Sequence, residues 1–184
     1  MEPVMARQRE FDEEKVLDAL KNIFWEKGFE GTSYTDIMKA TGLQKGSLYA
    51  AFGDKRALYQ KALHRYDQIH VSDAVTMLRN DNLSPAMRIE IFMTGPVDAA
   101  QTSQGRWGCL LCNAAIDQAP TDIDTENSVK ASMDRLKDGI VYTIEDEEKA
   151  DYILGAYFGA RVMVKAGYGK DRVKNIRAQV LKSL

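Results

Sequence analysis

The chain has 184 residues, of which 45% are hydrophobic and 28% are charged, and this balance excludes a disordered or fibrous protein. The formal net charge of −2 excludes a protein that is basic over its whole surface. No apolar run of about 18 residues is present, the first residues are polar, and there are only 2 cysteines, so we expect a cytoplasmic protein without a membrane span.

The first predicted helix follows Asp12, a good N-cap residue, and begins with two glutamates that suit the helix dipole. Its apolar residues recur at helical spacing and mark one buried stripe: Val16, Leu17, Leu20, Ile23 and Phe24. Gly28 is the predicted end of this helix. Upstream, Arg7 and Arg9 are expected either as plain surface residues or as a flexible arm that reaches DNA.

Two short helices follow, joined by a turn that contains glycine. Ser33 is the predicted cap of the first, with Asp36 as its reciprocal partner, and Gly42 ends it. The second helix covers residues 44–52. Two short helices around a glycine turn are typical of a helix-turn-helix, although a plain helical hairpin has the same pattern. Residues 34–66 carry six Lys and Arg against two Asp, so the positive charge of the chain is concentrated here.

The residue types on these helices predict a surface that binds double-stranded DNA. Slim polar residues in the first turn of the second helix can reach base edges in the major groove, with lysine suited to guanine and glutamine to adenine. Hydroxyls at the start of the first helix, and a tyrosine and a lysine beyond the second, suit phosphate. The candidate DNA-binding residues are Ser33, Thr35, Gln44, Lys45, Gly46, Ser47, Tyr49 and Lys55.

The rest of the chain continues with helical patterns and has no strand pattern. We expect one helix from Leu58 to about Leu78, and another that opens at Ser84-Pro85 and ends or kinks at Gly95-Pro96. Further helices are predicted over residues 107–118, 122–144, 146–166 and 171–184. The predicted fold is therefore all-α, with a three-helix N-terminal head and a C-terminal helical bundle.

The run from Phe11 to Tyr66 closely resembles the DNA-binding head of the TetR/AcrR regulators. The matching residues include Gly31-Thr32-Ser33, Thr41-Gly42-Leu43, Lys45-Gly46-Ser47-Leu48-Tyr49 and Phe52-Gly53-Asp54-Lys55. The resemblance implies a homodimer on a palindromic operator and a repressor that an unknown small-molecule effector releases. It divides the chain into a DNA-binding domain, 1–58, and a ligand-binding and dimerisation domain, 59–184. Two departures, Thr35 and Ala50-Ala51, put one phosphate contact and the operator sequence in question.

The segment from Gly108 to Asn113 resembles a Gly-Cys-Leu-Leu-x-Asn stretch that marks one subgroup of the same family. Candidate effector-pocket residues, any of which can equally be plain core, are Phe92, Arg106, Trp107, Cys109, Asn113 and Tyr157. Cys109 and Cys112 have three open interpretations: small core residues, reactive thiols, or half of a weak zinc site. We predict no metal and no cofactor.

Small residues spaced along helix 146–166, together with apolar residues of the last helix, predict a four-helix dimer interface, with packing inside one chain as the alternative. His64 and His70 are six residues apart and belong to no metal or catalytic motif, so we expect no enzyme. The alternatives to a regulator are a helical adaptor and a small helical enzyme, both without DNA binding. A steep salt dependence of DNA binding would separate the regulator from both.

Overall fold

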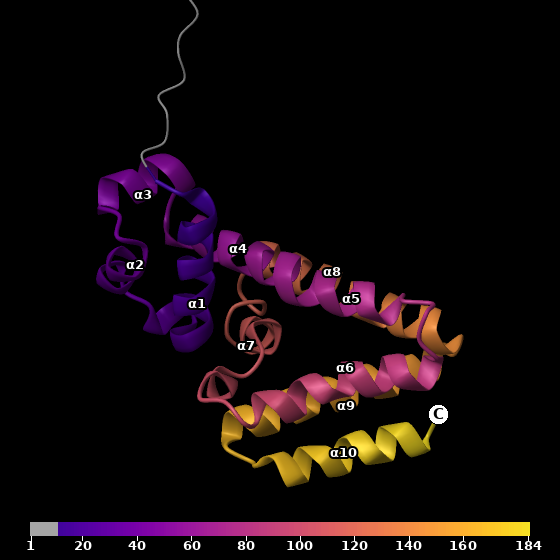
Figure 1. Ribbon diagram of the computed structural model, residues 1–184. Helices are drawn as coiled ribbons and strands as arrows, with labels where there is room; N and C mark the ends of the chain where they lie inside the picture. Colours follow the sequence, from indigo (N-terminus) through magenta and orange to yellow (C-terminus); the bar gives the residue numbers. More distant parts are fainter. Residues whose placement is uncertain (1–10) are drawn as a thin grey trace, which may run out of the picture.

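The computed structural model describes residues 11–184 and confirms the all-α fold. Within these residues there are ten α-helices, one π-helical segment and one 3₁₀ helix, and no strand. Three helices gather into a head at one end, and the remaining helices form an elongated body (Figure 1). No helix in this part of the chain is both long and apolar enough to cross a lipid bilayer.

The head consists of α1 (Glu13–Gly31), α2 (Tyr34–Thr41) and α3 (Lys45–Phe52). The carboxylate of Asp12 accepts a hydrogen bond from the backbone N–H of Lys15, so the predicted cap is present. Gly28, the predicted end of this helix, has non-helical backbone angles, with a φ of 73° and a ψ of 176°, so the regular helix is interrupted there as expected. A short helical turn follows across the kink and extends α1 to Gly31.

The head continues into the body through α4 (Lys55–Tyr66), which Asp54 caps. A π-helical segment (Asp67–Val71) then leads into α5 (Ser72–Leu78), so the helix expected over 58–78 is present with one wide turn inside it. α4 packs along α1, where Arg65 pairs with Asp18 at 2.9 Å. Because α4 spans the expected boundary at residue 58, it belongs to both the head and the body.

The connection between α6 (Pro85–Ala99) and α7 (Leu110–Asp117) differs from expectation. α6 does not end at Gly95-Pro96; the buried Pro96 lies in its last turn, where packing keeps one more turn helical. A 3₁₀ helix (Gln104–Trp107) follows. The predicted helix over 107–118 starts only at Leu110, because Gly108 has a φ of 80° and cannot be helical.

The body is completed by α8 (Ile123–Ile144), α9 (Glu147–Ala166) and α10 (Lys170–Lys182). α8 lies beside α4 and α5, while α6, α9 and α10 form a second group below them (Figure 1). α7 lies between the head and the body and packs against α1, α4 and α8. α7 therefore contacts both the head, through α1, and the body, through α8.

Candidate nucleic-acid interface

The start of α2 is fixed by a reciprocal cap. The hydroxyl of Ser33 accepts a hydrogen bond from the N–H of Asp36 at 3.1 Å, and the carboxylate of Asp36 accepts one from the N–H of Ser33 at 2.9 Å. Lys27 of α1 forms an ion pair with the same carboxylate. The Lys27 ammonium, followed by the Ser33 hydrogen bonds, holds the pKa of Asp36 well below its usual range. Asp36 therefore stays ionised and ties α2 to α1.

The turn and the anchors set the angle of α3. Gly42 ends α2 in the left-handed conformation, with a φ of 72° that favours glycine. Leu48 and Phe52 on α3, and Ile37 on α2, are buried in the head core. Because α3 is held from one side only, its opposite face is directed outward, as a helix that enters a DNA groove requires.

The predicted DNA-binding residues lie on the outer surface of the head. Seven of the eight are exposed and Lys55 is half-buried. Gly46 lies in the first turn of α3, and a Cβ atom added there would meet nothing within 4 Å. The first turn of α3 therefore carries no bulky group at Gly46, and an approaching ligand can come close to the backbone there.

A residue that the sequence analysis did not single out, Tyr34, lies at the centre of this surface. Its hydroxyl shares a hydrogen bond of 2.7 Å with that of Tyr49 and accepts the N–H of Lys55 at 3.0 Å. The two tyrosine rings stack at 5.5 Å, and the ammonium of Lys45 lies 4.6 Å from the centre of the Tyr34 ring. Tyr34 thus joins α2, α3 and the start of α4. An aromatic residue in an otherwise polar stretch was the only signal for it.

Electrostatically, this surface combines fixed cations with hydroxyls. Lys45 rests on aromatic rings, and the ammonium of Lys55 lies 4.6 Å from the centre of the Phe29 ring, so both ammonium groups are held in place. Burial and the hydrogen bond to Tyr49 raise the pKa of Tyr34, so its hydroxyl remains a neutral donor and acceptor. Such an array suits the phosphates and base edges of duplex DNA. Arg7 and Arg9 lie outside the described residues.

The predicted effector residues lie in several different surroundings. Cys109 and Tyr157 line a cavity of about 20 Å³ in the body, and Phe92 stacks on Tyr157 at 4.3 Å. Trp107 instead lies against Trp25 of α1, with 5.7 Å between ring centres. Arg106 is exposed and lies beside Gly167. Neither of these two residues lines the cavity beside Tyr157.

Asn113 lines a second hollow together with Cys109, a groove of about 180 Å³ between α7 and α9. Its side chain is fully engaged: the amide donates to the carbonyl of Trp107 at 2.9 Å and accepts from the ammonium of Lys165 at 2.6 Å. Arg161, also on the wall of this groove, has a buried Nε without a hydrogen-bond partner. Among residues 11–184 no cluster of three or more His, Cys, Asp or Glu side chains could hold a metal ion.

An outward-facing helix in a clamped helix-turn-helix, with lysines and hydroxyls around it, defines a DNA-binding protein. Residues 16–62 match the family model described as bacterial regulatory proteins, tetR family. The chain is 31% identical over 141 residues to the uncharacterised HTH-type transcriptional regulator YezE of Bacillus subtilis strain 168, covering 75% of this chain and 71% of the relative. The chain belongs to the TetR family and is a DNA-binding transcriptional regulator.

Two further relatives are similar over different lengths. The HTH-type transcriptional repressor ComR of Escherichia coli strain K12 is 26% identical over 125 residues, which cover 68% of this chain and 60% of ComR. A cysteine mutant of the regulator CifR, solved with a 26-base-pair operator duplex, is 25% identical and has a TM-score of 0.77. That alignment covers 97% of this chain and 99% of CifR, so the head and the body are both shared.

Proposed function

We propose that this protein is a homodimeric repressor that binds a palindromic operator through α3 and is released by a small-molecule effector. The observation that carries the proposal is the exposed α3 surface, where fixed lysines surround a slim first turn. ComR is a repressor by name, and CifR has been solved on operator DNA, which supports the same mode here. A protein that acts on chromosomal DNA works in the cytoplasm.

Each candidate residue has a role that follows from its place. Gln44, Lys45 and Ser47 lie in or before the first turn of α3 and would contact base edges in the major groove, with Gly46 admitting the DNA backbone. The remaining four would contact phosphates on either side of the groove: Ser33, Thr35, Tyr49 and Lys55. Tyr34 would act through Tyr49 and Lys55, whose positions it fixes.

The proposed dimer uses an uncovered face of α9. Tyr152 and Val162 are exposed there, and Cβ atoms added at Gly155 and Gly159 would meet nothing within 4 Å. These four residues follow one stripe along the helix, so a partner helix could approach closely. Ala160, Val173 and Val180, also considered for the interface from sequence, are instead buried within the chain.

Release of DNA by an effector would require the body to change shape. The cavity beside Tyr157 is about 20 Å³, whereas pockets for drug-sized ligands measure roughly 300 Å³ or more. A ligand that enters therefore favours a wider body, and it weakens DNA binding by its difference in affinity between the two shapes. The Gly108–Asn113 stretch lies at the start of α7, which packs against α1 and α8, and its sequence is the basis for the proposed Gly-Cys-Leu-Leu-x-Asn subgroup. The proposed domains remain 1–58 and 59–184.

The test is a salt titration of DNA binding with the Lys55→Ala variant. On a labelled duplex from the region upstream of the protein's own gene, wild type should bind with a steep salt dependence. Loss of one phosphate contact per protomer should weaken binding roughly tenfold or more and reduce the log–log salt slope by about 2 per dimer. Lys130→Ala, on the exposed surface of α8, is the matched control and should bind as wild type.

Sedimentation of the same samples gives the oligomeric state. A dimer for wild type and for both variants is the expected result, because neither lysine lies on the exposed α9 stripe. A monomeric protein that ignores duplex DNA even at low salt would overturn the proposal and leave the adaptor and the enzyme as the alternatives.

A further inference from the structure

Cys109 and Cys112 stand in a Cys-x-x-Cys register at the beginning of α7. Cys109 is the N-cap residue of this helix, and Cys112 is its third residue. Both thiols are free and buried. Side chains on a helix lean toward its N-terminus, so Cys112 is directed back toward Cys109. A cysteine pair in this register at a helix start can divide the roles of nucleophile and resolving thiol between its members.

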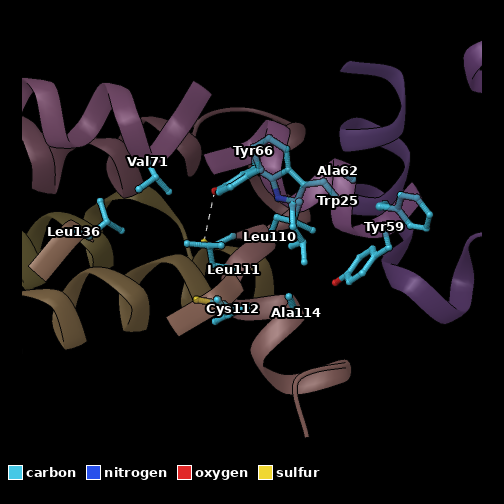
Figure 2. Close-up of a cluster of buried hydrophobic side chains, with 14 of the residues drawn as sticks. Trp25, Tyr59, Ala62, Tyr66, Val71, Leu110, Leu111, Cys112, Ala114 and Leu136 are labelled. Carbon is cyan, nitrogen blue, oxygen red and sulfur yellow. Dashed lines mark hydrogen bonds between the residues drawn. The ribbon is translucent and has the colours of Figure 1, made fainter. Parts of the chain in front are cut away.

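The surroundings distinguish the two sulfur atoms. The Cys112 thiol donates a hydrogen bond to Cys109, Arg161 carries a positive charge nearby, and the Tyr66 hydroxyl donates to the Cys109 sulfur at 3.5 Å, as the dashed line in Figure 2 shows. Together they lower the pKa of Cys109 despite its burial. The same hydrogen bond, helped by burial, raises the pKa of Cys112. Cys109 is therefore the more acidic thiol of the pair and Cys112 the less acidic one.

Small reagents can reach the pair. Both cysteines line the groove of about 180 Å³ between α7 and α9, although only 3% of Cys109 and 8% of Cys112 is exposed. A hydroperoxide with a small organic group fits a space of this size, whereas a peptide disulfide does not. The Arg161 and Lys165 side chains on the groove wall can donate hydrogen bonds to the departing oxygen.

The residue before Cys109 connects the groove to the head. The carbonyl oxygen of Gly108 accepts hydrogen bonds from Trp25 on α1 at 3.3 Å and from Arg161 on α9 at 2.9 Å. Because Gly108 directly precedes Cys109, a rearrangement of the Cys109 backbone would shift this carbonyl and so alter the contact between the head and the body.

We propose that Cys109 and Cys112 are a redox site that reacts with a small hydroperoxide, closes a reversible disulfide and, through Gly108, lowers the affinity of the head for DNA. In the first step the Cys109 thiolate attacks the O–O bond; an S–O bond forms, and the alkoxide or hydroxide leaves with a proton as alcohol or water. The Cys112 thiol then attacks the resulting sulfenic acid, forming the S–S bond and releasing water. The cysteine pair loses two electrons to the peroxide, and a small dithiol reverses the reaction.

The loss of DNA affinity rests on the proposed regulator function, whereas the reaction of the thiols does not. The experiment therefore measures both disulfide formation and DNA affinity. The full-length reduced protein is treated with hydrogen peroxide or cumene hydroperoxide, remaining thiols are alkylated after unfolding, and peptides are mapped by mass spectrometry. Affinity for the labelled upstream duplex is measured on the same samples. Wild type should yield the Cys109–Cys112 disulfide and lose affinity by about tenfold, within the usual range of allosteric coupling, and dithiothreitol should restore it.

Two variants separate the chemistry from simple damage. Cys112→Ser should stop at a Cys109 sulfenic acid that dimedone traps. Tyr66→Phe keeps the buried ring but removes the donated hydrogen bond, so the pH at which peroxide oxidation becomes half-maximal should rise. Circular dichroism establishes that both variants are folded.

Several results would overturn the proposal. If both thiols can still be alkylated after peroxide treatment, the two cysteines are plain core residues. If the disulfide forms but DNA affinity is unchanged, the oxidation is not coupled to DNA binding. A Cys109→Ser, Cys112→Ser double variant that loses affinity on peroxide treatment as wild type does would place the effect elsewhere. Reduced wild type that binds no duplex would contradict the regulator function, while a mapped disulfide would still support the redox site.

Discussion

α3 and α7 are both eight-residue helices, but their surroundings are opposite. α3 is anchored by two buried residues and leaves the rest of its surface to solvent, whereas five residues of α7 are buried, Leu110 to Ala114. Figure 2 shows side chains from α1, α4 and α8 packed around α7. A helix that recognises an outside partner needs few anchors, and a helix that transmits a change is enclosed by its neighbours. Substitutions near α7 should therefore act mainly on the free energy of unfolding, whereas substitutions on α3 should act mainly on the affinity for DNA.

The largest effect is expected for Gly105→Ala, just before α7. A Cβ atom at Gly105 would lie 1.8 Å from the backbone oxygen of Ala99, and backbone cannot move aside cheaply. We expect a loss of roughly 3 kcal/mol in the free energy of unfolding, measured by urea denaturation. Gly169→Ala is the control, because a Cβ atom there meets nothing within 4 Å. Equal stability of the two variants would show that the segment before α7 is not tightly enclosed.

An intermediate effect of opposite sign is expected for Gly46→Ala in α3. The added methyl group has free space in the isolated protein and improves helix propensity, so the free energy of unfolding should rise by up to about 1 kcal/mol. The same methyl group would separate α3 from DNA, and affinity for the upstream duplex should fall by about tenfold or more. Thermal unfolding and fluorescence anisotropy measure the two quantities. Unchanged DNA affinity would mean that the α3 backbone does not approach the groove.

The smallest effect is expected for Tyr34→Phe, which removes one hydroxyl from the interface. Two hydrogen bonds are lost, to Tyr49 and to the N–H of Lys55, while the stacked rings remain. We expect about 1 kcal/mol less stability and a several-fold lower affinity for DNA. Tyr49→Phe, the matched variant, keeps the Lys55 contact and should cost less stability. If Tyr34→Phe were as stable as wild type, Tyr34 would not be the residue that joins α2, α3 and α4.

Much of the head was predictable because its signals are local. Asp12, Ser33 and Asp54 cap the helices that their positions predict, and Gly42 adopts the left-handed turn expected of it. The eight candidate residues lie within 23 consecutive residues, 33–55, of two short helices and their flanks, and seven of them are exposed. Tyr34 was missed because its partners, Tyr49 and Lys55, are 15 and 21 residues away in the chain.

The region around α7 was less predictable because its contacts come from distant parts of the chain. Sequence alone offered no His or Lys near the cysteines, yet folding brings Arg161 and Lys165 of α9 to their groove. The candidate effector residues were grouped by type, but the structure separates exposed Arg106 from buried Phe92. Pro96 was expected to end or kink α6, and packing in the body outweighed that local preference.

The sequence by itself determined the helical class, the caps and turns of the head, and the residue types directed at DNA, because hydrogen bonds within a few residues and helical spacing specify them. Tertiary structure decided what surrounds the two thiols, which small residues of α9 remain uncovered, and how Gly108 joins Trp25 to Arg161. Those features depend on groups that lie far apart in the chain, as Tyr66 and Cys109 do at 43 residues and Gly108 and Arg161 at 53. Only the packed core brings such groups within hydrogen-bond distance.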